Sequence, residues 1–360
     1  MDAGKASARM GSDGGYGEGN GMSGGRLVVF DNLKFMLIAL VVIGHFADCY
    51  TAEHSSMRSL FLFIYSFHMP LFIFVSGLFV KQMGDSDRLN WNRIISFVAI
   101  GFLMKGISAV LTFVSSGWVP FSLLSDGGPA WFMFAIAAYT ALVWILRNVR
   151  KSYVLVFSVA LALLAGYDAS VGDFLYLSRI LVFFPFFWAG YCLSPAQVDG
   201  FTAKRGVRIV SAVALGVAVA VCILFISEVY GIRPFFTGRN SYEACGVDCA
   251  IVFRALAYCA SAVMCVAVMA FTPRRRIPLV SAFGPRTLQV YVWHGTALTL
   301  LGMTGVQAAI EPLFGGFGFL LFTALAVPVA FILSLAPFGV PLRPFLKIGA
   351  VDGGLKGAKA

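Results

Sequence analysis

Charged side chains are scarce in this sequence. Only 12% of its 360 residues are Asp, Glu, Lys or Arg, whereas 59% are hydrophobic and the mean hydropathy is +0.85. Soluble domains carry about twice that share of charge, so the composition excludes a soluble fold. The apolar runs are continuous and do not alternate with polar residues, so a helical bundle fits better than a β-barrel. The composition therefore predicts an all-α integral membrane protein embedded in a lipid bilayer.

Long polar segments are also few, and they lie at the two ends of the chain. Residues 1–26 are rich in Gly and hold no apolar run, which predicts a disordered cytoplasmic tail with no cleavable signal peptide before the first span. Residues 338–360 are too few to fold alone and are predicted to form a cytoplasmic C-terminal tail. Between them, residues 27–337 form the predicted transmembrane domain.

Breaks at polar, Gly and Pro residues divide that domain into a bundle of about ten predicted transmembrane helices. Their ranges are 28–48, 59–80, 93–115, 129–146, 153–167, 175–193, 207–230, 250–271, 286–304 and 317–337.

The positive charges agree with this division. With both termini cytoplasmic, twenty of the 27 Lys and Arg residues fall on the inner side and only Arg58, Arg233 and Arg239 fall in outer loops. Cytoplasmic loops of membrane proteins carry such an excess. The net charge of +10 therefore reflects topology, and we predict no nucleic-acid binding. The charge pattern suits a plasma or inner membrane as well as a Golgi-type membrane.

Histidine is rarer still, with four in the chain, and three of them (His45, His68 and His294) fall in predicted spans. A single intramembrane His is most simply an interhelical hydrogen-bonding group, but three indicate a shared function. No metal site is predicted, because the Cys245–Cys249 loop has no His to complete a zinc site. Whether Cys245 and Cys249 form a disulfide is left open.

Lys34 and His45 share one face of the first predicted span. The ten residues between them are apolar or Gly. Eleven helical residues turn by about three full turns and rise about 16 Å, so both side chains lie on one stripe. Asp31, one turn before Lys34, can pair with it. Ionisable groups inside a membrane span are costly and indicate a functional site.

Three further spans carry polar, proline or aromatic residues that point to a function. Pro70 follows His68 by two positions and is predicted to bend or break the second span, either as a packing kink or to open backbone carbonyls to a cavity near Ser76. Arg179 and Trp131 lie near outer span ends, where they either anchor the bilayer interface or contact a substrate.

Several motifs resemble the membrane acyltransferase-3 superfamily, and more narrowly its fucose 4-O-acetylase-like branch. The most specific are Asp31-Asn-Leu-Lys34 with Val41-Val-Ile-Gly-His45, and Tyr65-Ser-Phe-His68-Met-Pro70-Leu-Phe-Ile-Phe-Val-Ser76-Gly77. Weaker matches are Pro129-Ala-Trp131, Ser178-Arg179, Phe184–Tyr191 and Tyr291-Val-Trp-His294. The resemblance spans about residues 28–337. Lys34 stands where the family often has Arg.

The resemblance implies a ten-helix O-acyltransferase that moves an acyl group, commonly acetyl from acetyl-CoA, to a carbohydrate hydroxyl. It makes His45 the catalytic His and Lys34 its basic partner. By their chemistry, Lys34 suits the phosphates of acyl-CoA and His45 suits a general base. An acetyl-His intermediate is the alternative to direct transfer.

The remaining candidates have supporting roles. His68 is predicted to be catalytic. Attack on the acyl carbonyl forms an oxyanion, which needs a hydrogen-bond donor. The candidate donors are His68, His294, Tyr291 and Ser76. The predicted substrate-binding residues are Asp31, Ser76, Trp131, Arg179, Tyr291 and His294. We expect no permanently bound cofactor, and the sequence does not indicate the acceptor or the oligomeric state.

Two other functions compete with the enzyme. An exporter of a glycan or lipid-linked sugar would bind its substrate in the same cavity and catalyse no acyl transfer. Secondary transporters often have repeated halves, however, and this chain shows no clear repeat. A non-catalytic sensor with the same fold is the other alternative, and the three intramembrane histidines disfavour it.

Overall fold

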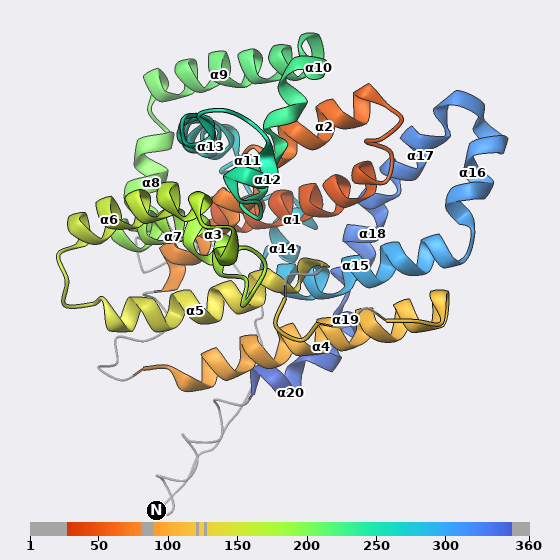
Figure 1. Ribbon diagram of the computed structural model, residues 1–360, viewed down its shortest axis with the longest axis horizontal. Coiled ribbons are helices and arrows are strands. Elements are labelled where there is room, and N and C mark those ends of the chain that lie inside the picture. Colours follow the sequence, from red (N-terminus) through yellow and green to blue (C-terminus); the bar gives the residue numbers. More distant parts are fainter. Residues whose placement is uncertain (1–26, 81–88, 120–121, 126–127, 348–360) are drawn as a thin grey trace, which may run out of the picture.

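The chain folds into a helical bundle (Figure 1). The computed structural model describes residues 27–80, 89–119, 122–125 and 128–347, and these contain helices but no strand. The predicted N-terminal tail, and residues 348–360 of the predicted C-terminal tail, lie outside the described residues.

Seven helical segments in the described part of the chain are long and apolar enough to cross a membrane. They are α1 (Val28–Asp48), α2 and α3 together (Ser55–Val80), α4 (Trp91–Ser116), a short turn with α5 (Gly128–Ile145), α9 (Arg205–Leu224), α13 (Ala250–Phe271), and α17 with α18 (Gly315–Leu333). The helices α7 (Leu177–Cys192) and α8 (Pro195–Thr202) meet at 94° and would add an eighth span. The all-helical, multi-pass membrane architecture is thereby supported, while the count of ten and the side of each terminus stay predictions.

Two further helices match predicted spans but are shorter than the seven. They are α6 (Lys151–Leu164) and α15 (Thr287–Met303). The other short helices are α10 (Ile226–Val229), α11 (Arg233–Thr237), α12 (Tyr242–Cys245), α14 (Val280–Phe283), α16 (Val306–Phe314), α19 (Ala336–Gly339) and α20 (Arg343–Leu346). Within 338–360, where a tail is predicted, α20 packs against α4, and the Ser96 hydroxyl donates to the Phe345 carbonyl at 2.6 Å.

Helix α1 occupies the inside of the bundle and α9 its edge. In α1, 61% of the apolar segment is buried by the rest of the protein, compared with 11% in α9. Figure 1 shows α9 on one side of the bundle, α4 and α20 on the other, and α1 between them. An apolar helix that the protein leaves uncovered, as α9 is, suits contact with lipid.

The helices α3 and α7 cross with their backbones in contact. A Cβ atom at Gly77 of α3 would lie 2.0 Å from the Phe187 carbonyl oxygen, and one at Gly190 of α7 would lie 2.1 Å from the Phe74 carbonyl oxygen. Only glycine permits so close an approach, as is common where membrane helices pack through small residues. This crossing fixes α3, and with it His68, relative to α7.

The second span is interrupted just before Pro70, as the sequence predicts. Helix α2 (Ser55–Tyr65) ends and α3 (His68–Val80) begins around Ser66 and Phe67, so Pro70 lies in the first turn of α3, where its missing N–H costs little. Proline cannot donate to the carbonyl four residues earlier, that of Ser66. The Ser261 hydroxyl of α13 donates to that carbonyl at 2.6 Å. The freed carbonyl is thus satisfied by a neighbouring helix.

Asn32 fastens the beginning of α1 to a distant loop. Its side chain is fully buried, and its amide donates to the carbonyls of Pro273 and Arg275 at 2.8 and 2.9 Å. Its amide oxygen accepts from the Ser281 hydroxyl at 2.6 Å. Because every polar group of the side chain is used, Asn32 sets the position of α1 at its Lys34 end.

All seven cysteines are free thiols. The disulfide left open between Cys245 and Cys249 is therefore absent from this structure.

Candidate active site

His45 lies in the last turn of α1, beside His294 of α15. The two ring centroids are 5.0 Å apart, and His68 and Arg179 lie close enough to interact with His45 electrostatically. The His45 side chain is partly exposed. In the part of the chain that the structure describes, neither of its ring nitrogens has a hydrogen-bond partner. His45 can therefore offer a nitrogen to a ligand.

His68 and His294 are held differently. Both are buried, with 3% and 1% exposure, and each uses Nδ1 to donate to a backbone carbonyl three or four residues earlier in the chain. The acceptors are Ile64, at 2.9 Å from His68, and Tyr291, at 2.6 Å from His294. A carbonyl only accepts, so in the neutral rings Nδ1 carries the hydrogen and Nε2 is an acceptor. The structure thus brings the three intramembrane histidines together, with His45 the most accessible.

A cavity of about 220 Å³ lies at the Lys34 end of α1. Its cations are Lys34 and Arg93, and most of its other lining is apolar and aromatic, from α3, α4, α5 and α15. The Lys34 ammonium lies 4.2 Å from the centroid of the Phe79 ring, a cation–π contact. Two cations beside an apolar chamber suit a ligand with an anionic head and an apolar arm.

Two predicted substrate-binding residues are found at this cavity, and a third lies near it. Ser76 and Tyr291 line its wall. Asp31 is buried, one turn before Lys34. The Ser76 hydroxyl donates to the Phe72 carbonyl at 2.9 Å, as a serine in a helix commonly does.

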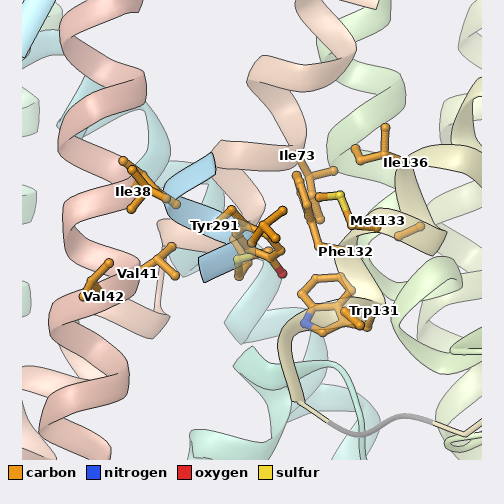
Figure 2. Close-up of a cluster of buried hydrophobic side chains, with 14 of the residues drawn as sticks. Ile38, Val41, Val42, Ile73, Trp131, Phe132, Met133, Ile136 and Tyr291 are labelled. Atoms are coloured by element: carbon orange, nitrogen blue, oxygen red, sulfur yellow. The ribbon is translucent and has the colours of Figure 1, made fainter. Parts of the chain in front are cut away.

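Tyr291 lines this cavity and also contacts His294, and Phe132 packs against it on the cavity wall. The ring centroids of Phe132 and Tyr291 are 5.0 Å apart, and the Tyr291 ring is also 5.4 Å from that of His294. The Tyr291 hydroxyl donates to the Pro129 carbonyl at 2.5 Å, which fixes the ring. Figure 2 shows Tyr291 between the side chains of Ile38, Val41 and Val42 on one side and those of Phe132, Ile73, Met133 and Ile136 on the other. We call the Phe132–Tyr291 pair the septum.

Arg179 and Trp131 form one unit on the histidine side of the septum. The Arg179 guanidinium lies 4.7 Å from the Trp131 ring, and that ring also stacks on Phe183 at 5.4 Å. Trp131 is 6% exposed, whereas Arg179 is partly exposed. Trp131 thus supports Arg179, which in turn can reach a ligand beside His45.

Lys105, for which the sequence indicates no role, holds the loop that precedes α5. Its ammonium donates to the carbonyls of Ser122, Leu123 and Ser125 and to the Tyr176 hydroxyl, at 2.7 to 3.0 Å. Tyr176 directly precedes α7, so Lys105 ties the loop before Trp131 to the helix that carries Arg179.

Ion pairs join helices and loops near the histidine end of the bundle. Asp48 accepts from Arg233 at 3.1 Å. In the loop before α7, Asp173 accepts two hydrogen bonds from Arg239, at 2.8 and 2.6 Å, and these hold the pKa of the Asp173 carboxyl below its usual value.

Sequence reasoning missed three residues near the site. The sequence places Arg93 only among the twenty positive charges of the inner side, and it places Tyr65 and Asn32 only within motifs. The one available signal for Tyr65 is its position three residues before His68, which puts both on neighbouring turns. For Arg93, the signal is its closeness to a predicted span end on the Lys34 side.

Residues 27–337 match a protein-family model described as an acyltransferase domain. Comparison with curated proteins and with solved structures finds no match.

Proposed function

This chain belongs to the acyltransferase-3 family, and on that premise we propose that it moves an acyl group, most simply acetyl, from cytosolic acyl-CoA to a hydroxyl of a carbohydrate or glycoconjugate. Family membership makes it a membrane acyltransferase. The donor, the acceptor and the residues that carry the reaction are our proposal.

The observation that carries the proposal is the arrangement along α1. Lys34 lines a cavity at one end, and about 16 Å further along the same helix face lies His45 with both ring nitrogens uncommitted. In our proposal the Lys34 end faces the cytosol, where acyl-CoA is made, and Lys34 with Arg93 contacts its phosphates. The apolar chamber takes the pantetheine arm, and the thioester passes the septum to reach His45.

In this proposal, an uncommitted ring nitrogen of His45 accepts the proton that the reaction releases. The acceptor hydroxyl gives its proton to a ring nitrogen of His45 while its oxygen attacks the thioester carbonyl. Collapse of the tetrahedral adduct breaks the C–S bond, and the CoA thiolate takes the proton from the His45 imidazolium. The products are an ester and CoA, and His45 is regenerated.

The decisive experiment uses the purified full-length protein in nanodiscs, with labelled acetyl-CoA and a panel of glycans. We expect label transfer by the wild type and a loss of about 10²-fold or more in His45→Ala, the usual share of a general base. His54→Ala is the matched control, because His54 lies outside the helix that carries His45, just before α2, and stacks on Phe319. Transfer at the wild-type rate in His45→Ala would refute the base.

The acceptor is best identified in cells. Mass spectrometry of surface and secretory glycans, with the protein present, deleted or replaced by His45→Ala, should reveal an acetyl mass that only the wild type adds. Identical glycans in all three would exclude carbohydrate as the acceptor.

A further inference from the structure

An acyl-transfer centre needs a hydrogen-bond donor for the oxyanion that forms on the thioester carbonyl. The four donors that the sequence suggests have already used their hydrogens. The Ser76 hydroxyl donates to Phe72, and the Tyr291 hydroxyl donates to Pro129. His68 and His294 each donate through Nδ1 to a backbone carbonyl, so their Nε2 atoms accept.

Tyr65, at the end of α2, has a hydroxyl whose hydrogen is still available to donate. In the part of the chain that the structure describes, no residue hydrogen-bonds with the Tyr65 hydroxyl, and the side chain is partly exposed. Its ring stacks on Phe61 at 3.6 Å and meets the His68 ring edge-on at 4.4 Å. The ring is therefore fixed while its polar end stays available.

The position of that polar end is set by Gly44. A Cβ atom at Gly44 would lie 3.2 Å from Cε2 of Tyr65, a ring carbon next to the one that bears the hydroxyl. Gly44 directly precedes His45, so the hydroxyl end of Tyr65 lies against α1 at the level of the proposed base. Arg179, Asp48 and Arg233 are also within electrostatic reach of the Tyr65 hydroxyl.

We infer that Tyr65 is a catalytic residue whose hydroxyl donates a hydrogen bond to the thioester oxyanion, beside the Arg179 guanidinium. This inference rests on the proposed function. As the acceptor oxygen forms the new C–O bond and loses its proton to His45, the carbonyl π electrons move onto the oxygen that Tyr65 and Arg179 stabilise. They return to re-form the carbonyl when the C–S bond breaks and CoA leaves.

The test is Tyr65→Phe, assayed for acyl transfer in nanodiscs. The variant keeps the ring, so its contacts with Phe61, His68 and Gly44 and its melting temperature should be unchanged. Loss of one oxyanion donor should lower kcat by about 10²- to 10³-fold, with the KM for acyl-CoA unchanged. Tyr65 replaced by 3-fluorotyrosine retains the hydroxyl and should restore kcat to within about threefold of wild type.

Tyr242→Phe is the matched control. The Tyr242 hydroxyl donates to the Leu163 carbonyl at 2.6 Å and has a structural role away from the histidines. That variant should lower the melting temperature and leave kcat unchanged, the reverse of Tyr65→Phe.

Three results would contradict a catalytic role for the Tyr65 hydroxyl. A Tyr65→Phe enzyme with kcat within threefold of wild type overturns the inference, and so does an effect confined to the KM of the acceptor. A fluorotyrosine variant as slow as Tyr65→Phe also overturns it. If the wild type itself transfers no acyl group, the proposed function fails, and that result is distinct from a Tyr65 variant that matches an active wild type.

Discussion

The three histidines of the site have the same side chain but different capacities, because of what their ring nitrogens already bind. Backbone carbonyls hold Nδ1 of His68 and His294 and so fix their tautomers. His45 has no such partner among the described residues and stays partly exposed. Because of this difference, His45 is the base in our proposal, whereas His68 and His294 lie beside it as hydrogen-bond acceptors.

Lys34 supports a prediction at the same scale. Lys34→Gln should raise the KM for acyl-CoA by about tenfold or more, since a hydrogen bond to a charged group contributes about 1.5–3 kcal/mol. Arg93→Gln should act in the same direction because Arg93 lines the same cavity. Initial-rate kinetics over a range of acyl-CoA concentrations would measure both effects.

Lys347→Gln is the control for these variants, because Lys347 is exposed and does not line the cavity. An unchanged KM in both Lys34→Gln and Arg93→Gln would show that the donor phosphates bind elsewhere.

At the scale of elements, the close crossing of α3 and α7 requires glycine at the point of contact. Gly77→Ala should destabilise the protein by about 1–3 kcal/mol or more, because its Cβ would overlap the Phe187 carbonyl of α7. Thermal unfolding of the purified protein in detergent would measure the loss.

Gly106→Ala is the matched control for this substitution. Gly106 lies within α4, and a Cβ there would meet no atom within 4 Å. Alanine favours a helix over glycine, so this variant should be as stable as wild type or more so. Equal stability of the two variants would contradict the backbone contact between α3 and α7.

The elements also show what the sequence could and could not predict. Helices such as α1, α4 and α13 lie within about two residues of their predicted ranges, because continuous apolar runs mark them directly. The sequence also predicts a break near Pro70. It could not show that Ser261 of a distant helix satisfies the Ser66 carbonyl at this break, because that contact depends on how the helices pack. The sequence also does not predict Tyr65 and Arg93 as site residues. Packing between helices, rather than a local sequence pattern, brings them to the site.

At the scale of the whole molecule, the loops at the histidine end contribute a pH-dependent term. Asp173 has a lowered pKa because Arg239 donates two hydrogen bonds to it. A lowered carboxyl pKa stabilises the folded state above the usual aspartate pKa of 3.8, and the stabilisation is lost as pH falls through the lowered value. Both side chains are about two-fifths exposed, so we expect only about 0.2–1 kcal/mol.

Asp173→Asn tests this term. Its melting temperature should fall slightly below that of the wild type at pH 7, and the gap should close as the pH drops below about 4. A gap that is constant over this range would assign the effect of the substitution to something other than the Asp173 charge.

The septum has an electrical consequence for the membrane. In our proposal the donor and the acceptor approach His45 from opposite sides of the bilayer, and an open passage between them would conduct ions. A charge that crosses a potential of 100 mV gains about 2.3 kcal/mol, so even a narrow leak would dissipate the cell's stored voltage. In our proposal the packed rings of Phe132 and Tyr291 close this passage whenever no acyl chain lies in it, so the two substrates can react without an ion leak across the bilayer.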